Sequence, residues 1–239
     1  SGGYTVSSNN ATLTVAPIPT ITSSATANAV CNSSSAQNSG LSYSATTGSP
    51  THYSITWDGT ALAAGLVNVS STLLPASPIT IPVAAGVAAA TYNGTLIVSN
   101  ASCSNTGNAF TLTINPLPTI TGTLNLCTGA TTQLNGSGVP AGSTPWVSAT
   151  TGVATVNSTG LVSRVSNGTS VITYTNNSGC SQSATVSVNT PPGALSMSPS
   201  ATSTCNGTVK SITVTNYQNN SPQTNSSGAI SLTIPDNLS

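Results

Sequence analysis

The sequence predicts an all-β protein made of tandem β-sandwiches, and three observations lead to this fold class. Short stretches alternate apolar and hydroxyl-bearing residues, as half-buried strands do. Gly, Asn, Ser and Pro separate these stretches, and no stretch has a convincing helical period. A strand followed by a proline-rich junction, residues 12–21, returns as residues 111–120 and more loosely as 185–192. Many short strands between turn residues favour sandwiches over a parallel sheet.

The proline-rich junctions divide the chain into four segments. Paired prolines cannot continue a strand ladder, and they stiffen a linker towards polyproline geometry, so we expect domain boundaries there. Residues 17–115 and 116–190 are predicted to be two complete domains. Residues 1–16 and 191–239 are expected to be parts of an incomplete sandwich, split between the two chain ends.

Strands are expected in every segment. The first segment offers a closing hairpin with strands at 3–6 and 11–15. The first complete domain offers strands at 41–45, 52–57, 79–83, 91–98 and 109–114. The second offers strands at 131–134, 146–148, 153–156, 161–165, 170–175 and 184–188. The last segment offers strands at 194–198, 209–216 and 229–234.

Two parts of the sequence resemble known families. Residues 152–174 resemble the hallmark hairpins of the bacterial group 2 immunoglobulin-like domain. Residues 53–58 and 90–98 are similar to companion modules in long repetitive surface proteins of gliding, type IX-secreting bacteria. The resemblance implies tandem immunoglobulin-like β-sandwiches in an exported surface or adhesin stalk without catalytic activity.

Five cysteines, none in a CxxC pair, fit disulfides in an oxidising compartment better than a metal site. Each complete domain has an early Cys, a central Trp and a late Cys, as immunoglobulin sandwiches do when a tryptophan packs on an inter-sheet bridge. A rule of one bridge per domain then pairs Cys31 with Cys103 and Cys127 with Cys180. Cys205 is left over as a buried free thiol, as a residue whose partner lies outside this sequence, or as an intermolecular bond to a neighbouring subunit.

The two terminal segments complement one another. Tyr4 and Val6 lie in the expected first strand of the hairpin, where a tyrosine often caps the corner, and Leu13 and Val15 lie in the second. Natural proteins protect the open edges of a sheet with lysines, prolines or bulges, and this chain has one lysine.

We therefore expect copies to join head to tail, with residues 1–16 of one copy completing residues 193–239 of the next by strand addition. Such a contact need not close and gives a filament. The alternative is that the 239 residues are one window of a longer covalent repeat.

Charged residues make up 2% of the chain, against about 25% in ordinary domains. The chain has two cationic and two acidic side chains, so we expect neither nucleic acid nor an anionic membrane surface as a partner. The longest apolar run, residues 83–90, is far shorter than the ~20 residues that a membrane-spanning helix needs.

No enzyme is expected either. His52 and Asp58 lie roughly 20 Å apart along an extended strand, which is beyond hydrogen-bond reach, and the chain has no GxSxG motif. The two carboxylates, Asp58 and Asp236, belong to different domains, which excludes a glycosidase pair. With one His and no Glu, we expect no metal centre and no cofactor. A weak calcium site built from backbone carbonyls is the alternative that these residue types leave open.

Glycans are a possible covalent addition, because the nearly neutral surface lacks the charge that keeps proteins apart. Thirteen of the 24 asparagines lie in Asn-x-Ser/Thr, and the Ser and Thr hydroxyls are alternative acceptors. The candidate asparagines are Asn68, Asn93, Asn135, Asn157, Asn167 and Asn206.

The sequence therefore predicts a structural subunit or repeat of an extracellular bacterial filament or cell-surface adhesin stalk, with copies of itself as partners. The alternative is a glycan-binding adhesin module in which Trp57 and Trp146 stack on sugars. Their place on central strands favours packing in the core instead.

Overall fold

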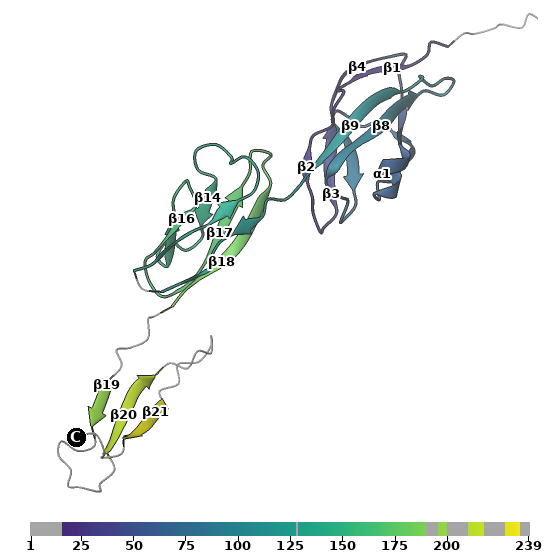
Figure 1. Cartoon of the computed structure of the whole chain (residues 1–239). Coiled ribbons are helices and arrows are strands. Elements are labelled where there is room, and N and C mark those ends of the chain that lie inside the picture. Colours follow the sequence, from purple (N-terminus) through teal and green to yellow (C-terminus); the bar gives the residue numbers. More distant parts are fainter. Residues whose placement is uncertain (1–15, 128, 190–195, 200–209, 218–227, 235–239) are drawn as a thin grey trace, which may run out of the picture. The chain divides into compact units, whose positions relative to one another are not determined.

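A computed structural model describes residues 16–127, 129–189, 196–199, 210–217 and 228–234. The described residues between 16 and 189 form two β-sandwiches with a single short helix (Figure 1). The predicted all-β, immunoglobulin-like class is confirmed. The expected hairpin within residues 1–15 lies outside the described residues, as do Tyr4, Val6, Leu13 and Val15.

The first sandwich has a five-stranded sheet in the order β2-β9-β8-β5-β6 and two strand pairs, β1-β4 and β3-β7. Strand β2 runs parallel to β9, and the other neighbours are antiparallel. This is the strand order of an immunoglobulin sheet with its short parallel strand beside the last strand. The bounds are β1 Thr20–Ser23, β2 Val30–Cys31, β3 Gln37–Leu41, β4 Tyr43–Thr47, β5 His52–Trp57, β6 Val69–Leu73, β7 Ile79–Val83, β8 Ala90–Ser99 and β9 Asn108–Asn115.

Both layers of the first sandwich share one apolar core. Alternate residues of β8 are buried, as expected for a strand with one face inward. Ile55 and Leu96 from the large sheet and Ile79 from β7 are fully buried in this core. The ring of Trp57 packs edge-to-face on Phe110, with ring centroids 5.3 Å apart. Trp57 is therefore a core residue, as the sequence predicted.

One expected strand, residues 41–45, is two strands. Leu41 ends β3, which pairs with β7, whereas Tyr43 begins β4, which pairs with β1. The chain changes partner at Ser42, and the alternating pattern continues across this point, so the pattern alone could not reveal it. After β5, Asp58 caps the short helix α1 (Gly59–Ala63).

A tyrosine holds the corner at the start of β8. The Tyr92 hydroxyl donates a hydrogen bond of 2.9 Å to the carbonyl oxygen of Ala88, four residues upstream. A tyrosine at this place, bonded back to the preceding backbone, is characteristic of immunoglobulin-like sandwiches.

The second sandwich is smaller and has sheets in the orders β11-β18-β17-β14 and β12-β16-β15, with the additional pair β10-β13. Strand β11 runs parallel to β18, as β2 does to β9. Trp146, Ile172 and Tyr174 are buried in its core. The bounds are β10 Ile120–Thr121, β11 Asn125–Leu126, β12 Thr131–Gln133, β13 Asn135–Gly136, β14 Trp146–Ser148, β15 Ala154–Val156, β16 Leu161–Arg164, β17 Gly168–Thr175 and β18 Ser181–Val188.

The last described segment is a three-stranded antiparallel sheet in the order β19-β20-β21. Its strands are β19 (Ser196–Pro199), β20 (Lys210–Tyr217) and β21 (Gly228–Ile234). They lie within two residues of the strands expected at 194–198, 209–216 and 229–234.

Candidate functional site

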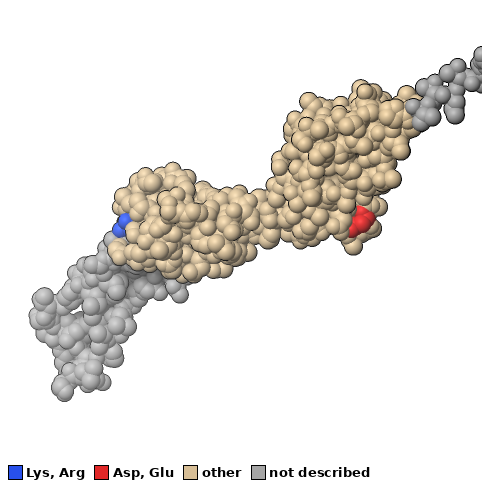
Figure 2. Space-filling view, turned by 90° about the horizontal axis from the view of Figure 1, so that it is seen from above, with Lys and Arg blue, Asp and Glu red and all other residues tan. Residues whose placement is uncertain are grey.

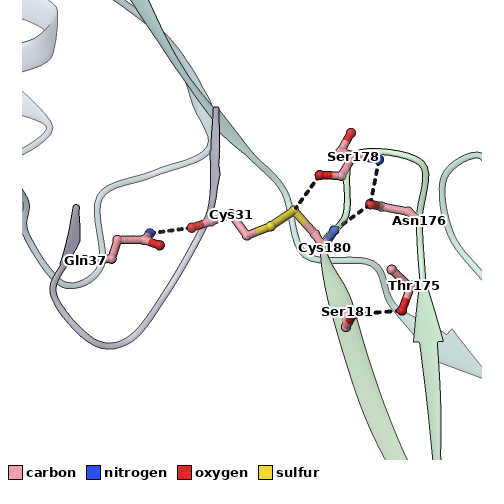
Figure 3. Close-up of a disulfide and its surroundings, with 7 residues drawn as sticks. All are labelled: Cys31, Gln37, Thr175, Asn176, Ser178, Cys180 and Ser181. Carbon is pink, nitrogen blue, oxygen red and sulfur yellow. Dashed lines mark hydrogen bonds between the residues drawn. A yellow bond between two sulfur atoms is a disulfide. The ribbon is translucent and has the colours of Figure 1, made fainter. Parts of the chain in front are cut away.

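A disulfide joins Cys31 in β2 of the first sandwich to Cys180 in the turn between β17 and β18 of the second (Figure 3). The two Cα atoms are 5.6 Å apart, and 149 residues separate the cysteines in the sequence. Cys103 and Cys127 are free thiols. The predicted pairs Cys31–Cys103 and Cys127–Cys180 are therefore wrong.

Strand register explains why the first predicted pair cannot form. Cys31 lies opposite Asn115, the last residue of β9, whereas Cys103 lies in the turn before that strand begins. A strand of this length spans about 25 Å, and a disulfide needs Cα atoms within about 7 Å.

The second predicted pair fails for the same reason. Cys127 follows β11, which pairs with the end of β18, and Cys180 lies just before β18 begins. In each sandwich the two cysteines therefore lie at opposite ends of the last strand, and a bridge within either domain is excluded.

Three hydrogen bonds hold the backbone around Cys31. The Gln37 side chain donates from Nε2 to the carbonyl oxygen of Cys31 over 2.5 Å. The backbone N–H of Asn32 donates to the oxygen of Asn115 over 2.8 Å, and its Nδ2 donates to the oxygen of Val87 over 2.7 Å. These bonds tie β2 to the end of β9, to the start of β3 and to the loop that contains Val87.

A single asparagine organises the turn around Cys180. Asn176 Oδ1 accepts hydrogen bonds from the N–H groups of Cys180 at 3.0 Å and Ser178 at 3.1 Å (Figure 3). The Asn176 N–H donates to the carbonyl oxygen of Cys180 over 2.9 Å. Gly179 has φ of +77°, a left-handed conformation that glycine adopts without strain. Cys180 is completely buried, so the turn fixes its sulfur in one place.

Both bonded cysteines belong to one compact unit of the chain. This unit comprises the described residues up to Thr119 together with Gly136–Pro145 and Tyr174–Gln182. The turn that carries Cys180 is thus grouped with the first sandwich, although the strands on either side of it, β17 and β18, belong to the second.

The first sandwich has the same turn. Asn100 follows β8 as Asn176 follows β17, and its Oδ1 accepts from the N–H groups of Cys103 at 2.8 Å and Ser102 at 2.9 Å. The Asn100 N–H donates to the carbonyl oxygen of Cys103 over 2.9 Å. Cys103 therefore occupies the place in the first sandwich that Cys180 occupies in the second.

The free thiol Cys103 lies beside the junction that precedes the first sandwich. Its Sγ donates to the carbonyl oxygen of Ala16 over 3.9 Å. Asn100 Nδ2 also reaches this junction, donating to the oxygens of Gly48 at 2.9 Å and Pro17 at 3.3 Å.

Cys127 corresponds in the same way to Cys31. In the first sandwich, Val30 lies opposite Ile114, and Cys31 follows it. In the second, Leu126 lies opposite Val188, and the exposed Cys127 follows it. Sequence reasoning missed both correspondences. For the turn cysteines Cys103 and Cys180, an asparagine three or four residues before the cysteine, directly after a long strand, was the signal that could have revealed the match.

A surface pocket of about 470 Å³ is lined by the end of β5, the middle of β8 and the first half of β9. Asp58 is at its rim and accepts hydrogen bonds from Thr60 Oγ1 at 2.6 Å, Ala61 N–H at 2.8 Å and Asn93 Nδ2 at 3.0 Å. These three hydrogen bonds lower the pKa of Asp58 to about 2, and the bond from Thr60 has the largest effect. His52 lies at the other end of β5, so the structure does not bring it near Asp58.

Charge is almost absent from the face of the described part shown in Figure 2. Among the residues with described side chains, no three His, Cys, Asp or Glu gather into a set that could hold a metal ion. No helix in the described ranges is long and apolar enough to cross a membrane.

The candidate glycosylation sites that the structure describes lie on the surface. Asn68, Asn93, Asn135, Asn157 and Asn167 are all exposed. Asn206 and the remaining cysteine, Cys205, lie outside the described residues.

No protein-family model matches the chain, and no curated protein matches it. Among solved structures, the chain is similar to the titin domains Z1Z2 in complex with telethonin, at 14% identity and a TM-score of 0.32, over 74% of this chain and 98% of that one. It is similar to the C-terminal fragment of intimin in complex with the intimin-binding domain of its receptor, at 15% identity and a TM-score of 0.39, over 76% of this chain and 66% of that one.

A third similar structure is SGBP-B of the Bacteroides ovatus mixed-linkage glucan utilization locus in complex with a heptasaccharide. The identity is 18% and the TM-score 0.27, over 93% of this chain and 62% of that one.

Proposed function

We propose that this chain is a structural part of an extracellular array of immunoglobulin-like sandwiches, in a surface filament or adhesin stalk. The observation that carries the proposal is the Cys31–Cys180 disulfide, which fastens one sandwich to the next in addition to the polypeptide junction. A second covalent connection between successive domains suits a protein that transmits tension. It also suits an oxidising location outside the cytoplasm.

In this proposal the chain has no enzymatic activity. The acid–base candidates His52 and Asp58 lie at opposite ends of one strand. The Asp58 carboxylate is already used to cap α1 and to bind Asn93. The weakly charged surface supports a partner of the same kind, namely further copies or repeats of these sandwiches, rather than nucleic acid or membrane.

Joining is proposed to be head to tail, with residues 1–16 of one copy adding strands to residues 193–239 of the next. Tyr92 supports this assignment, because it caps the corner before β8 in the way proposed for Tyr4 in the hairpin. The sheet β19-β20-β21 would receive the added strands. The alternative that fits the same array is one continuous chain of many repeats.

Electron microscopy of native material tests the array directly, and we expect regular fibres with sandwich-sized beads. Denaturing electrophoresis with reductant then separates the two modes of joining. A single band near 23.4 kDa supports strand addition between copies, and a ladder or a very large band supports a continuous chain. Isolated monomers in native material would contradict the proposal.

Covalent glycans on exposed asparagines or hydroxyls are part of the proposal, because they would hydrate a surface that lacks charge. Intact mass of the native protein tests this point. A mass equal to that of the bare polypeptide would remove it without affecting the array.

The second candidate function is a glycan-binding module, and the pocket beside Asp58 and Asn93 is the observation that favours it. Trp57 and Trp146 offer no stacking platform, because both are buried. A glycan array with the isolated chain tests this candidate. Reproducible binding that is lost in Asn93→Ala supports it, and no binding removes it.

A further inference from the structure

The free cysteines Cys103 and Cys127 stand where the bonded cysteines stand in the neighbouring sandwich. We propose that both are disulfide sites for further sandwiches of the same kind. Cys103 would bond to the sandwich that runs into Ala16, and Cys127 to the sandwich that follows Asn189. The inference rests on the proposed array and names the covalent bond that joins its successive domains.

The first argument is the pair of matching turns. In both turns an asparagine Oδ1 holds the N–H of the cysteine, at 2.8 Å for Cys103 and 3.0 Å for Cys180. In both, the asparagine N–H donates to the cysteine carbonyl over 2.9 Å. The turn that positions the bonded Cys180 in the second sandwich is thus repeated around the free Cys103 in the first, with the same hydrogen bonds.

The second argument is where the thiol of Cys103 lies. Residues 15–19 repeat the pattern of residues 114–118, which makes Ala16 the counterpart of Asn115. Cys31, the partner of Cys180, lies opposite Asn115. A preceding sandwich built in the same way places its cysteine opposite Ala16, and the Sγ of Cys103 lies 3.9 Å from the Ala16 carbonyl oxygen.

The third argument concerns Cys127 at the other end. Leu126 accepts a hydrogen bond of 2.9 Å from the N–H of Asn189, the last described residue before the next proline-rich junction. Cys127 is exposed at this point, and it follows β11 as Cys31 ends β2. It is therefore placed to receive a cysteine from the turn between the last two strands of a following sandwich.

Each bond would form by oxidation of two thiols. Two protons leave, the sulfurs join, and the electron pair reduces the disulfide of a thiol–disulfide oxidoreductase in the exporting compartment to a dithiol. For Cys103 the partner thiol comes from another copy of this chain or from a neighbouring repeat of a longer chain. For Cys127 it comes from a repeat of a longer chain, because residues 1–16, which would close the following sandwich if copies join head to tail, contain no cysteine. Cys205, which precedes β20 by a few residues as Cys31 precedes β3, is the thiol that another copy has available.

The experiment is disulfide mapping of native material that is alkylated without reductant, digested and analysed by mass spectrometry. We expect Cys103 in cross-linked peptides in both modes of joining, and Cys127 in cross-linked peptides when the chain is continuous. The Cys31–Cys180 pair is the internal control. A link from Cys103 to Cys205 identifies another copy as the partner. A link to a cysteine outside this sequence identifies a continuous chain.

Alkylated Cys103 and Cys127 in material that forms fibres would overturn this inference and leave the proposed array standing. A bond between Cys103 and Cys127 would overturn it as well. Isolated monomers with alkylated thiols would overturn both.

A matched variant tests the role of the turn. Cys103→Ser combined with Ser102→Cys keeps one thiol in the turn but moves it one residue away from the position that corresponds to Cys180. We expect at least a tenfold lower cross-linked fraction in the native host, while the Cys31–Cys180 bond stays complete. Equal cross-linking of the shifted thiol would overturn the role of the turn.

Asn100 is expected to act as a positioning residue. Asn100→Ala removes the acceptor for two N–H groups and should lower the cross-linked fraction of Cys103 several-fold. Asn100→Asp retains an acceptor oxygen and should restore it. Equal yields in both variants would contradict this role.

Discussion

The two sandwiches differ in their sheets and cores but share the same backbone arrangement around their cysteines. The first has a five-stranded sheet, the helix α1 and a core around Trp57 and Phe110, whereas the second has a four-stranded sheet and a core around Trp146 and Tyr174. Both have a short strand parallel to the last strand, followed or ended by a cysteine. Both also have an asparagine-held turn with a second cysteine.

This comparison shows which features depend on specific residues. Apolar residues of about the right size can fill a core in many combinations. A disulfide requires two Cα atoms at a defined separation, so the backbone that carries each cysteine must be fixed. The hydrogen bonds that the two sandwiches share lie around their cysteines, where the backbone must be fixed. The core residues are under no such requirement and differ.

The largest effect is expected from cutting the junction between the sandwiches. A protease site inserted between Asn115 and Thr119 should give two pieces that remain together without reductant and separate with it, because Cys31–Cys180 bridges the cut. Electrophoresis provides the measurement. The same insertion in Cys180→Ser should release both pieces without reductant. Release of the pieces from the otherwise unchanged chain would mean that the disulfide lies elsewhere.

Next in size are truncations in the two cores. Ile55→Ala and Ile172→Ala each remove a completely buried side chain from a central strand, and each should cost about 2–5 kcal/mol of unfolding free energy. Because the cores are separate, each variant should lower one of two unfolding transitions in denaturant.

The matched controls for these truncations are Val67→Ala and Val147→Ala, whose side chains are exposed. They should change the free energy of unfolding by no more than about 0.5 kcal/mol. A loss of both transitions in either core variant would show that the sandwiches unfold as one unit.

Smaller losses are expected where a glycine lies under an aromatic ring. A Cβ at Gly94 would lie 2.6 Å from Phe110 Cζ, and a Cβ at Gly136 would overlap the ring of Tyr174. Gly94→Ala and Gly136→Ala should each cost about 1–3 kcal/mol through overpacking. Gly59→Ala and Gly152→Ala meet no atom within 4 Å and serve as controls in the same chemical denaturation. Unchanged stability of the first two variants would show that the rings move aside easily.

The smallest expected effect is a difference between the two sandwiches in how their stability depends on pH. Asp58 has a pKa of about 2, lowered from 3.8 by its hydrogen bonds. The contribution of its carboxylate to the free energy of unfolding is present above pH 3.8 and is lost as pH falls towards 2. Protonation weakens the hydrogen bonds from Thr60, Ala61 and Asn93. Residues 116–189 contain no Asp, Glu, Lys or His, so the second sandwich should keep a constant stability between pH 5 and pH 2.

NMR titration of the Asp58 carboxyl checks the pKa. Chemical denaturation at pH 5 and at pH 2 checks the stability of each sandwich. Asp58→Asn should remove the pH dependence of the first sandwich. A titration midpoint near 3.8 would show that the cap does not bind the carboxylate in solution.

Most strands were predictable because a strand's alternation is local. Residues 52–57, 79–83 and 146–148 were expected as strands and are β5, β7 and β14. The helix α1 and the strands β1, β2, β6, β10, β11 and β13 were missed. Residues 69–73 have only a weak alternating pattern, α1 is a single short turn of helix, and β2, β10, β11 and β13 have two residues each. The change of partner at Ser42 was missed because the pattern is the same on both sides of it.

The functional site was predictable only in part. Five cysteines in a weakly charged chain correctly indicated a disulfide, but the rule of one bridge per domain assigned the wrong partners. The asparagine before each turn cysteine was visible in the sequence. Its meaning depended on the hydrogen bonds of Asn100 and Asn176, which a pattern of residue types does not specify.

The all-β class, most strand positions and the junctions could be derived from the residues alone, because each depends on which face of a strand is buried or on the backbone limits of proline. The bond between Cys31 and Cys180, 149 residues apart, followed only from the folded chain. That choice depends on which ends of strands meet in space. Parallel pairing of β2 with the end of β9 carries Cys31 away from Cys103 and to the turn that carries Cys180.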